Sequence, residues 1–155
     1  MTDCEQQKQI RDFIRRLNTR EFRDVMLPEY ALGKPLFDAV KTGIEGGRLS
    51  HHQTANGLAV LSRLRGFGEG DDVFDLFVTS LSHPHQRVRD KAVRLTIEYM
   101  RSQRWHARYY SPTSIDMLRV AAATALDEHS RWLINKLLER GPAAWEFPRL
   151  RHGQQ

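Results

Sequence analysis

One short stretch of the chain interleaves arginine with aromatic side chains, and these residue types are well suited to bind a charged or aromatic partner. If the stretch is helical, Arg101, Arg104 and Arg108 share one face, because they are spaced three and four positions apart. Trp105 and Tyr109 then lie beside them. Guanidinium groups bind phosphate or carboxylate, and aromatic rings stack on bases or anchor a protein interface. The alternative is that the two rings cover a seam between helices while the arginines are solvated.

The seven histidines raise the question of a metal site. His51 and His52 are adjacent, so their side chains diverge on a helix, and His83 and His85 flank Pro84 in an expected turn. A zinc site normally needs paired ligands at a defined spacing, and no cysteine or carboxylate cluster completes one here. We therefore expect no metal, and we assign these histidines to turn and cap positions.

An enzyme needs a nucleophile, a base and a pocket that excludes water. Cys4 is the only cysteine, and the chain end is a poor place to exclude water. The glycine-rich stretch from Gly66 to Gly70 lacks the lysine and the following serine or threonine of a phosphate-binding loop, and no strand precedes it. The sequence therefore predicts a non-enzymatic protein without a cofactor.

The composition is that of a globular protein with a basic surface. The 155 residues suffice for one domain with its own core, and 40% of them are hydrophobic and 28% charged. The formal net charge is +5, and arginine accounts for 19 of the 24 basic residues. This excess favours an acidic protein partner or nucleic acid, although arginines on solvated helix faces give the same composition.

The expected location is the cytoplasm. No stretch approaches the roughly 18 apolar residues that span a bilayer, so we expect no membrane contact. The polar start of the chain lacks the basic and apolar segments of a secretory signal. A single cysteine cannot form an internal disulfide and fits a reducing compartment.

The elements that must position these residues are all expected to be helices, because apolar residues recur at helical spacing almost throughout the chain. We find no credible strand and assign the all-α class. The expected helices run from Thr2 to Leu17, from Thr19 to Met26, from Pro35 to the glycine at 43, from Ser50 to Leu64, from Asp71 to Leu81, from Pro84 through Met100, from Pro112 to Leu126, and from Glu128 to Arg140.

Caps and glycines set the expected boundaries of these helices. Thr2 with Glu5 and Ser50 with Gln53 have the spacing of capping boxes. Gly33 is expected to close the region of the second helix. Six other glycines are expected to end the third helix, at Gly43, Gly46 and Gly47, and to form a flexible connector, at Gly66, Gly68 and Gly70.

A short pattern recurs along the chain and indicates two helix-turn-helix units in tandem. Phe37-Asp38 recurs as Phe74-Asp75. A His-Gln pair follows each of them, His52-Gln53 and then His85-Gln86. Repeats of this kind stack into an elongated helical array.

The second unit resembles a repeat of the HEAT (armadillo/HEAT) type. Pro84, Val88, Arg89 and Ala92 sit at the spacing of the HEAT-repeat turn and second helix, so we expect structural roles for them. The resemblance implies a short right-handed α-solenoid of about three to four antiparallel helix pairs. We assign it to residues 1–142 as a single domain. Residues 143–155 are expected to form a tail that is partly packed and then flexible.

The chain departs from the pattern of that family at informative places. Acidic residues flank the proline in the family, whereas histidines stand there in this sequence. The resemblance implies that Arg89 is buried and pairs with an aspartate of a neighbouring repeat, and Asp72 and Asp75 are the nearest candidates. The first unit has Asn56 at the place of this arginine, so we expect any side-chain ladder to be broken there.

The candidate binding residues follow from the same resemblance, because the second helices of a HEAT-like stack line its concave, partner-binding surface. The residues expected on that surface or in its extension are Arg87, Lys91, Arg94, Glu98, Arg101, Arg104, Trp105 and Arg108. The first hypothesis is a binding module or adaptor for a protein partner, whose surface can be acidic. The alternative is binding of nucleic acid through its phosphates.

A HEAT-like DNA-repair glycosylase is a less favoured third hypothesis. Such enzymes use tryptophan, arginine and one catalytic aspartate on the concave face. Trp105, Trp132, Arg131 and Asp116 have suitable side chains but no convincing alignment. This hypothesis requires a buried carboxylate beside Trp105 or Trp132.

Overall fold

The protein is all-helical in the part of the chain that the computed structural model describes, residues 2–20, 22, 26–68, 72–102, 112–124 and 127–139, and no strand occurs there. The expected all-α class is therefore confirmed. The helices are α1 (Asp3–Arg16), α2 (Met26–Glu45), α3 (His51–Arg63), the short 3-10 helix η1 (Arg65–Phe67), α4 (Asp72–Ser80), α5 (Gln86–Ser102), α6 (Pro112–Thr124) and α7 (Glu128–Glu139).

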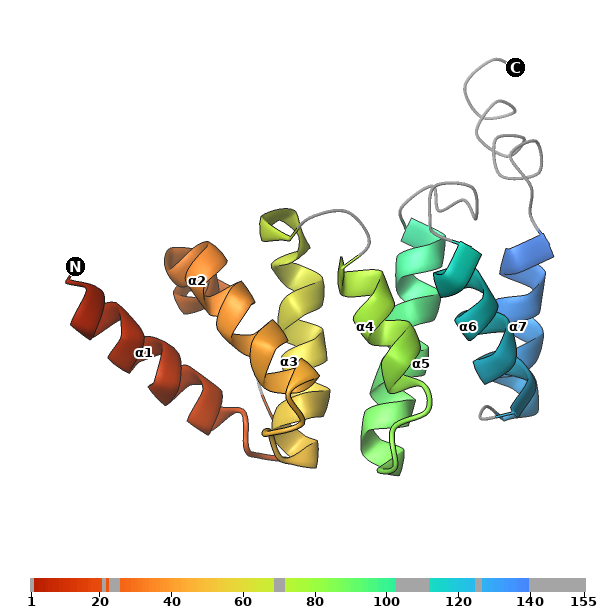
Figure 1. Ribbon diagram of the computed structural model, residues 1–155, viewed down its shortest axis with the longest axis horizontal. Coiled ribbons are helices and arrows are strands. Elements are labelled where there is room, and N and C mark those ends of the chain that lie inside the picture. Colours follow the sequence, from red (N-terminus) through yellow and green to blue (C-terminus); the bar gives the residue numbers. More distant parts are fainter. Residues whose placement is uncertain are drawn as a thin grey trace, which may run out of the picture.

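The helices follow one another in a row along the long axis of the molecule (Figure 1). α1 packs on α2 and α3, and α2 packs on α3. α3, α5 and α7 contact one another in succession, and α4 contacts α6 in front of them. α5 is therefore covered by α3, α4 and α7.

A continuous apolar core joins the helices. Val88 and Ala92 of α5 are completely buried, so their expected structural role agrees with their position. Phe74 and Phe77 of α4 are also buried, and their rings lie 5.7 and 6.2 Å from the ring of Tyr99 on α5. Aromatic contacts of this kind strengthen packing beyond the area that they bury.

Both predicted capping boxes are confirmed. The Thr2 hydroxyl accepts the Glu5 N–H at 3.1 Å, and the Ser50 hydroxyl accepts the Gln53 N–H at 3.1 Å. The second box also connects α3 to α1, because Gln53 Nε2 donates to the Ile14 carbonyl at 3.1 Å. The Ser50 hydroxyl donates to Asn18 Oδ1 at 2.7 Å. The start of α3 is thus fixed against the end of α1.

The predicted break at Gly33 and the helix from Pro35 are confirmed inside α2. Gly33 has a φ of 56°, which interrupts the helical backbone, and Pro35 lies in the first turn of the segment that follows. The prediction of a helix from Thr19 is wrong for the described residues Thr19, Arg20 and Phe22, which are not helical. The carbonyl of Thr19 instead accepts a hydrogen bond from Asn56.

Two predictions about glycines are also corrected. Gly43 lies inside α2, which continues to Glu45, whereas Gly46 and Gly47 follow the end of the helix as predicted. The expected flexible connector is packed at Gly68, where an added Cβ would lie 2.6 Å from Cζ of Phe37. Gly68 therefore allows the backbone to approach the core closely. Gly70 of that connector lies outside the described residues.

The boundaries of the C-terminal helices differ slightly from the predicted ones. α5 begins at Gln86, so Pro84 lies in the turn before the helix and not in its first turn. Asp127 caps α7 by accepting the Ser130 N–H at 2.9 Å and the Ser130 hydroxyl at 2.8 Å. These two bonds hold the pKa of Asp127 below its usual range, and the bond from the N–H has the larger effect. The expected cap Asp71 and the tail 143–155 lie outside the described residues.

Candidate functional site

The predicted binding residues of α5 lie on one face of that helix. Their spacing alternates between four and three positions, which places them in a single stripe. Arg94, Glu98 and Arg101 are exposed, whereas Arg87 and Lys91 are half-buried. We call these five residues the α5 stripe. Arg104, Trp105 and Arg108, which were expected to extend it, lie outside the described part of the chain.

Positive charge concentrates around Lys91 in the middle of this stripe. Burial lowers the pKa of Lys91, and the nearby cations Arg94 and Arg87 lower it further. Arg63 of α3 acts in the same direction, whereas Glu98 favours the charged lysine. Arg94 and Arg87 each lower the pKa more than Glu98 raises it, so this one carboxylate does not offset the surrounding cations. The basic surface therefore spans α3 and α5.

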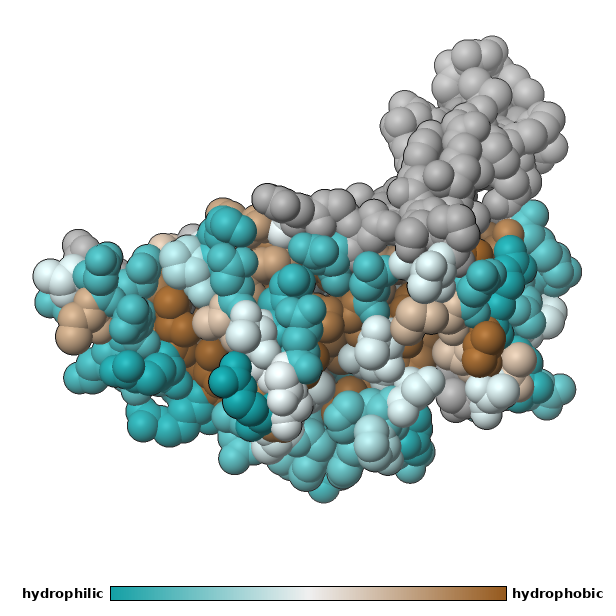
Figure 2. All heavy atoms as spheres, viewed as in Figure 1, coloured by the Kyte–Doolittle hydropathy of each residue, from teal (hydrophilic) through white to brown (hydrophobic). Residues whose placement is uncertain are grey.

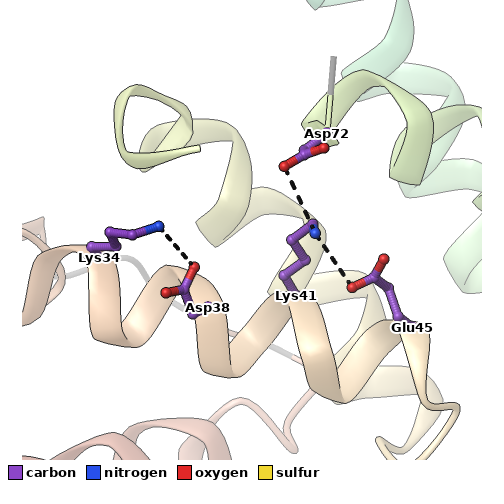
Figure 3. Close-up of polar contacts among 5 residues, drawn as sticks. All are labelled: Lys34, Asp38, Lys41, Glu45 and Asp72. Atoms are coloured by element: carbon purple, nitrogen blue, oxygen red, sulfur yellow. Dashed lines mark hydrogen bonds and ion pairs between the residues drawn. The ribbon is translucent and has the colours of Figure 1, made fainter. Parts of the chain in front are cut away.

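The charges of α2 are arranged differently (Figure 3). Lys34 forms an ion pair with Asp38 at 3.3 Å. Lys41 lies between Glu45 at 3.5 Å and Asp72 of α4 at 3.7 Å. Each cation of α2 thus has a carboxylate within 4 Å. In α5, by contrast, Arg94 and Arg87 lie near Lys91 and disfavour its positive charge.

Arg87 is part of a hydrogen-bond network that joins three segments of the fold. Its Nη2 donates to Asn56 Oδ1 and to the Arg20 carbonyl, each at 3.1 Å. Asn56, which is only 3% exposed, donates from Nδ2 to the carbonyls of Leu17 at 2.8 Å and Thr19 at 2.9 Å. Asn56 thus links α5 to the turn after α1 through these hydrogen bonds, in place of the arginine–aspartate pairing of the resembled family.

Arg89 has a structural role, but its partners are not the expected aspartates. Its Nη1 donates to the carbonyls of His83 and Pro84, each at 2.8 Å. Asp72 pairs with Lys41, and Asp75 accepts a hydrogen bond from the hydroxyl of Ser114. Arg89 is half-buried and reaches back over its own turn, whose carbonyls need donors.

The histidines of the 81–85 turn act as caps, as expected. His83 Nδ1 accepts the N–H of His85 at 3.0 Å, and His85 Nδ1 accepts the N–H of Arg87 at 3.1 Å. These bonds satisfy N–H groups at the start of α5 that have no partner within the helix. An imidazole nitrogen accepts such a bond only when it carries no proton.

The structure brings His51 and His52 to the same place, which sequence reasoning missed. The rings of His51 and His85 stack with centroids 3.8 Å apart and planes 8° apart, and the ring of His52 lies 4.1 Å from that of His51. We call His51, His52, His83 and His85 the histidine cluster. The recurring His-Gln pair was the available signal, because the histidines of both pairs, His52 and His85, belong to the cluster.

The environment of the cluster disfavours charge on two of its members. Burial lowers the pKa of His52, and nearby His51, Arg87, His85 and Arg20 lower it further, in that order. Burial likewise lowers the pKa of His83, followed by the effect of His85. Nδ1 of His52 is buried and has no hydrogen-bond partner among the described residues. Neutral imidazoles therefore suit this site better than charged ones.

A cavity of about 480 Å³ lies between α2, α3 and α4, and its carboxylates already have partners. Lys41 pairs with Glu45 and Asp72, and Ser114 donates to Asp75. Within the part of the chain that the structure describes, no three His, Cys, Asp or Glu side chains are arranged to hold a metal ion.

The C-terminal helices carry an exposed apolar surface, part of which Figure 2 shows over α6. Val120 and Met117 of α6 are 63% and 42% exposed, and Trp132 of α7 is 55% exposed. The neighbouring carboxylates Asp127 and Glu128 are exposed as well. Among the described residues, the buried carboxylate that a glycosylase requires is therefore not found beside Trp132. Trp105, the other candidate, lies outside the described residues.

The fold and site together define an all-helical protein with a basic face that adjoins a histidine cluster. Comparisons of the chain with protein families, curated proteins and solved structures find no match. Among the described helices, none is both long and apolar enough to cross a membrane. The function therefore has to be argued from the residues of the site.

Proposed function

We propose that the protein is a non-enzymatic, HEAT-like binding module that presents the α5 stripe to an acidic protein partner. The observation that carries this proposal is the group of cations around Lys91, which Glu98 does not offset. A cluster of groups of one charge favours association with a surface of the opposite charge.

The arrangement of the helices supports a short right-handed α-solenoid. α2 with α3, α4 with α5, and α6 with α7 would form the antiparallel pairs, and each pair is in contact. The contacts of α3 with α5 and of α5 with α7 are those expected between the second helices of successive pairs. α1 would then cover the N-terminal end of the stack.

The packing of α5 supports rigid presentation of the stripe. α3, α4 and α7 surround the helix, and Val88, Ala92 and Met100 hold it through buried contacts. The remaining face carries Arg94 and Arg101 into solvent. A preorganised helix loses little conformational entropy when a partner binds, so its charged groups contribute more of their interaction energy to affinity.

Charge reversal tests this function. The double substitution Arg94→Glu with Arg101→Glu should reduce recovery of the bound protein from extracts of the native cell about tenfold, the effect of roughly 1.4 kcal/mol. The control, Arg15→Glu with Lys34→Glu, changes the net charge equally on α1 and α2. Quantitative mass spectrometry of proteins recovered with each variant measures the effect. Equal losses with both doubles would contradict the proposal.

The second candidate is binding of nucleic-acid phosphates, which the cations around Lys91 also favour. Titration with duplex and single-stranded DNA and RNA at two salt concentrations distinguishes the two. Phosphate binding should weaken steeply with salt, because bound cations release counterions from the nucleic acid. No binding at low salt would remove this candidate.

A further inference from the structure

We propose that the histidine cluster is an acid-responsive junction, which joins the start of α5 to the start of α3 when its imidazoles are neutral and weakens when they are protonated. The proposal concerns the stability of the fold and does not depend on the proposed partner. It rests on two capping bonds, one stacked pair and the charges around them.

The capping bonds require neutral imidazoles. His83 Nδ1 and His85 Nδ1 each accept a backbone N–H, at 3.0 and 3.1 Å. Protonation of Nδ1 removes the hydrogen-bond acceptor, and the new N–H of the ring then points at the backbone N–H that it had accepted. It also places a positive charge at the N-terminus of α5, the positive end of the helix dipole. One proton therefore both breaks a cap and creates a repulsion.

The stacked pair of His51 and His85 means that a histidine of α3 is also favoured in its neutral form. The rings of His51 and His85 lie 3.8 Å apart, and the ring of His52 lies 4.1 Å from His51. Neutral rings can stack at this distance, whereas like charges so close disfavour each other. Because His51 belongs to α3 and His85 precedes α5, this repulsion acts across the junction between the two helices.

The neighbouring charges reinforce this effect. Arg87 of α5 and Arg20, which follows α1, face His52 together with His51 and His85. Arg89 of α5 faces His83. All of these groups are cations or imidazoles that become cations.

Carboxylates occur on the other side of His83, which also lines the cavity between α2, α3 and α4. The charged groups lining this cavity are Lys41, Glu45, Asp72 and Asp75. Lys41 pairs with Glu45 and Asp72, and Asp75 accepts from Ser114. No ion pair between a carboxylate and a member of the histidine cluster occurs among the described residues. The carboxylates of this cavity are thus engaged elsewhere.

The sign of the pH effect follows from proton binding. The pKa values of His52 and His83 lie below the ordinary value of 6.5 in the folded protein, so the unfolded chain binds more protons as the pH falls through 6.5. Each such group raises the equilibrium constant of unfolding by up to about tenfold per pH unit. The stabilisation is complete above pH 6.5 and is lost as the pH falls toward the lowered pKa values.

The test is urea unfolding of the full chain at pH 7.5, 6.5 and 5.5. The substitutions His83→Asn and His85→Asn, made together, keep a side-chain acceptor at both caps and remove the titrating groups. Between pH 7.5 and 5.5 the unfolding constant of the wild type should rise more than that of the double variant, by up to about tenfold. His129→Asn, at an exposed site of α7, serves as the control and should retain the wild-type pH dependence. Equal pH dependence in the wild type and the double variant would overturn the proposal.

A second measurement remains decisive if the double variant does not fold. An NMR titration of the wild type should give His52 and His83 midpoints below 6.5. The amide resonances of His85 and Arg87 should shift with the imidazoles that accept their N–H groups. Midpoints at or above 6.5, or amides that do not respond to the imidazole titrations, would contradict the acid-responsive junction.

Discussion

α3 and α5 each carry a His-Gln pair at or next to their first turn, but they have different surroundings. When the pairs are aligned, Leu58 and Leu61 of α3 correspond to Lys91 and Arg94 of α5. Both leucines are completely buried, whereas Lys91 is half-buried and Arg94 is exposed. α3 has α1 as an additional neighbour, together with α2, α4 and α5. The same positions of the pattern thus carry buried leucines in α3 and half-buried or exposed cations in α5.

The backbone carbonyls of two turns also receive hydrogen bonds from different side chains in the two units. Asn56 and Arg89 occupy equivalent positions, and each donates to two backbone carbonyls. Asn56 reaches the turn after α1, whereas Arg89 reaches its own preceding turn. Buried carbonyls need donors, so the requirement recurs although the residue type and the bonded segment differ.

Exchange of the aligned residues should have the largest effect. Leu61→Arg places an unpaired charge in the core and should destabilise the protein by about 4 kcal/mol or more. The reverse change, Arg94→Leu, should alter the free energy of unfolding by about 0.5 kcal/mol or less. Urea unfolding at pH 7.5 measures both. Similar losses in the two variants would show that α3 and α5 are not different environments.

Removal of the turn donors should have a smaller effect. Asn56→Ala leaves the carbonyls of Leu17 and Thr19 without this donor and should cost about 3 kcal/mol, because Asn56 is buried. Arg89→Ala should cost about 1 kcal/mol, because the turn of the half-buried Arg89 is accessible to water. Urea unfolding gives the order, with Asn135→Ala at an exposed site of α7 as the control. An equal or reversed order would contradict these roles.

Removal of the helix caps should have the smallest effect and a different pH dependence in each unit. Ser50→Ala should cost about 1 kcal/mol at both pH 7.5 and pH 5.5, because a hydroxyl does not titrate in this range. His83→Ala should cost about 1 kcal/mol at pH 7.5 and less at pH 5.5, where the cap is already protonated in part. If the free-energy cost of His83→Ala were the same at both pH values, the two caps would not differ in pH dependence, which would contradict this prediction.

Features that depend on a few neighbouring residues could be predicted from the sequence. The capping boxes at Thr2 and Ser50 require only residues three positions apart. The break at Gly33 followed by Pro35 depends on local backbone geometry. The stripe on α5 follows from helical spacing, because its members are separated by three or four positions.

Features that depend on contacts between distant segments could not be predicted in the same way. The stack of His51 on His85 and the bond from Arg87 to Asn56 form only when α3 and α5 lie side by side. Arg89 was expected to pair with an aspartate, but the carbonyls of its own turn are its partners. The sequence pattern identified a residue that needs a partner, and the tertiary structure determined which partner it has.

Site-specific cross-linking tests the central claim that α5 presents the binding surface. A photoreactive amino acid placed at Arg94 in the full chain should cross-link a specific protein in the native cell. The same amino acid at Lys34, on the charge-compensated face of α2, should not cross-link that protein. Capture at position 94 alone is the result that the account predicts. Capture of the same protein with equal yield at both positions, or of no specific protein at position 94, would contradict it.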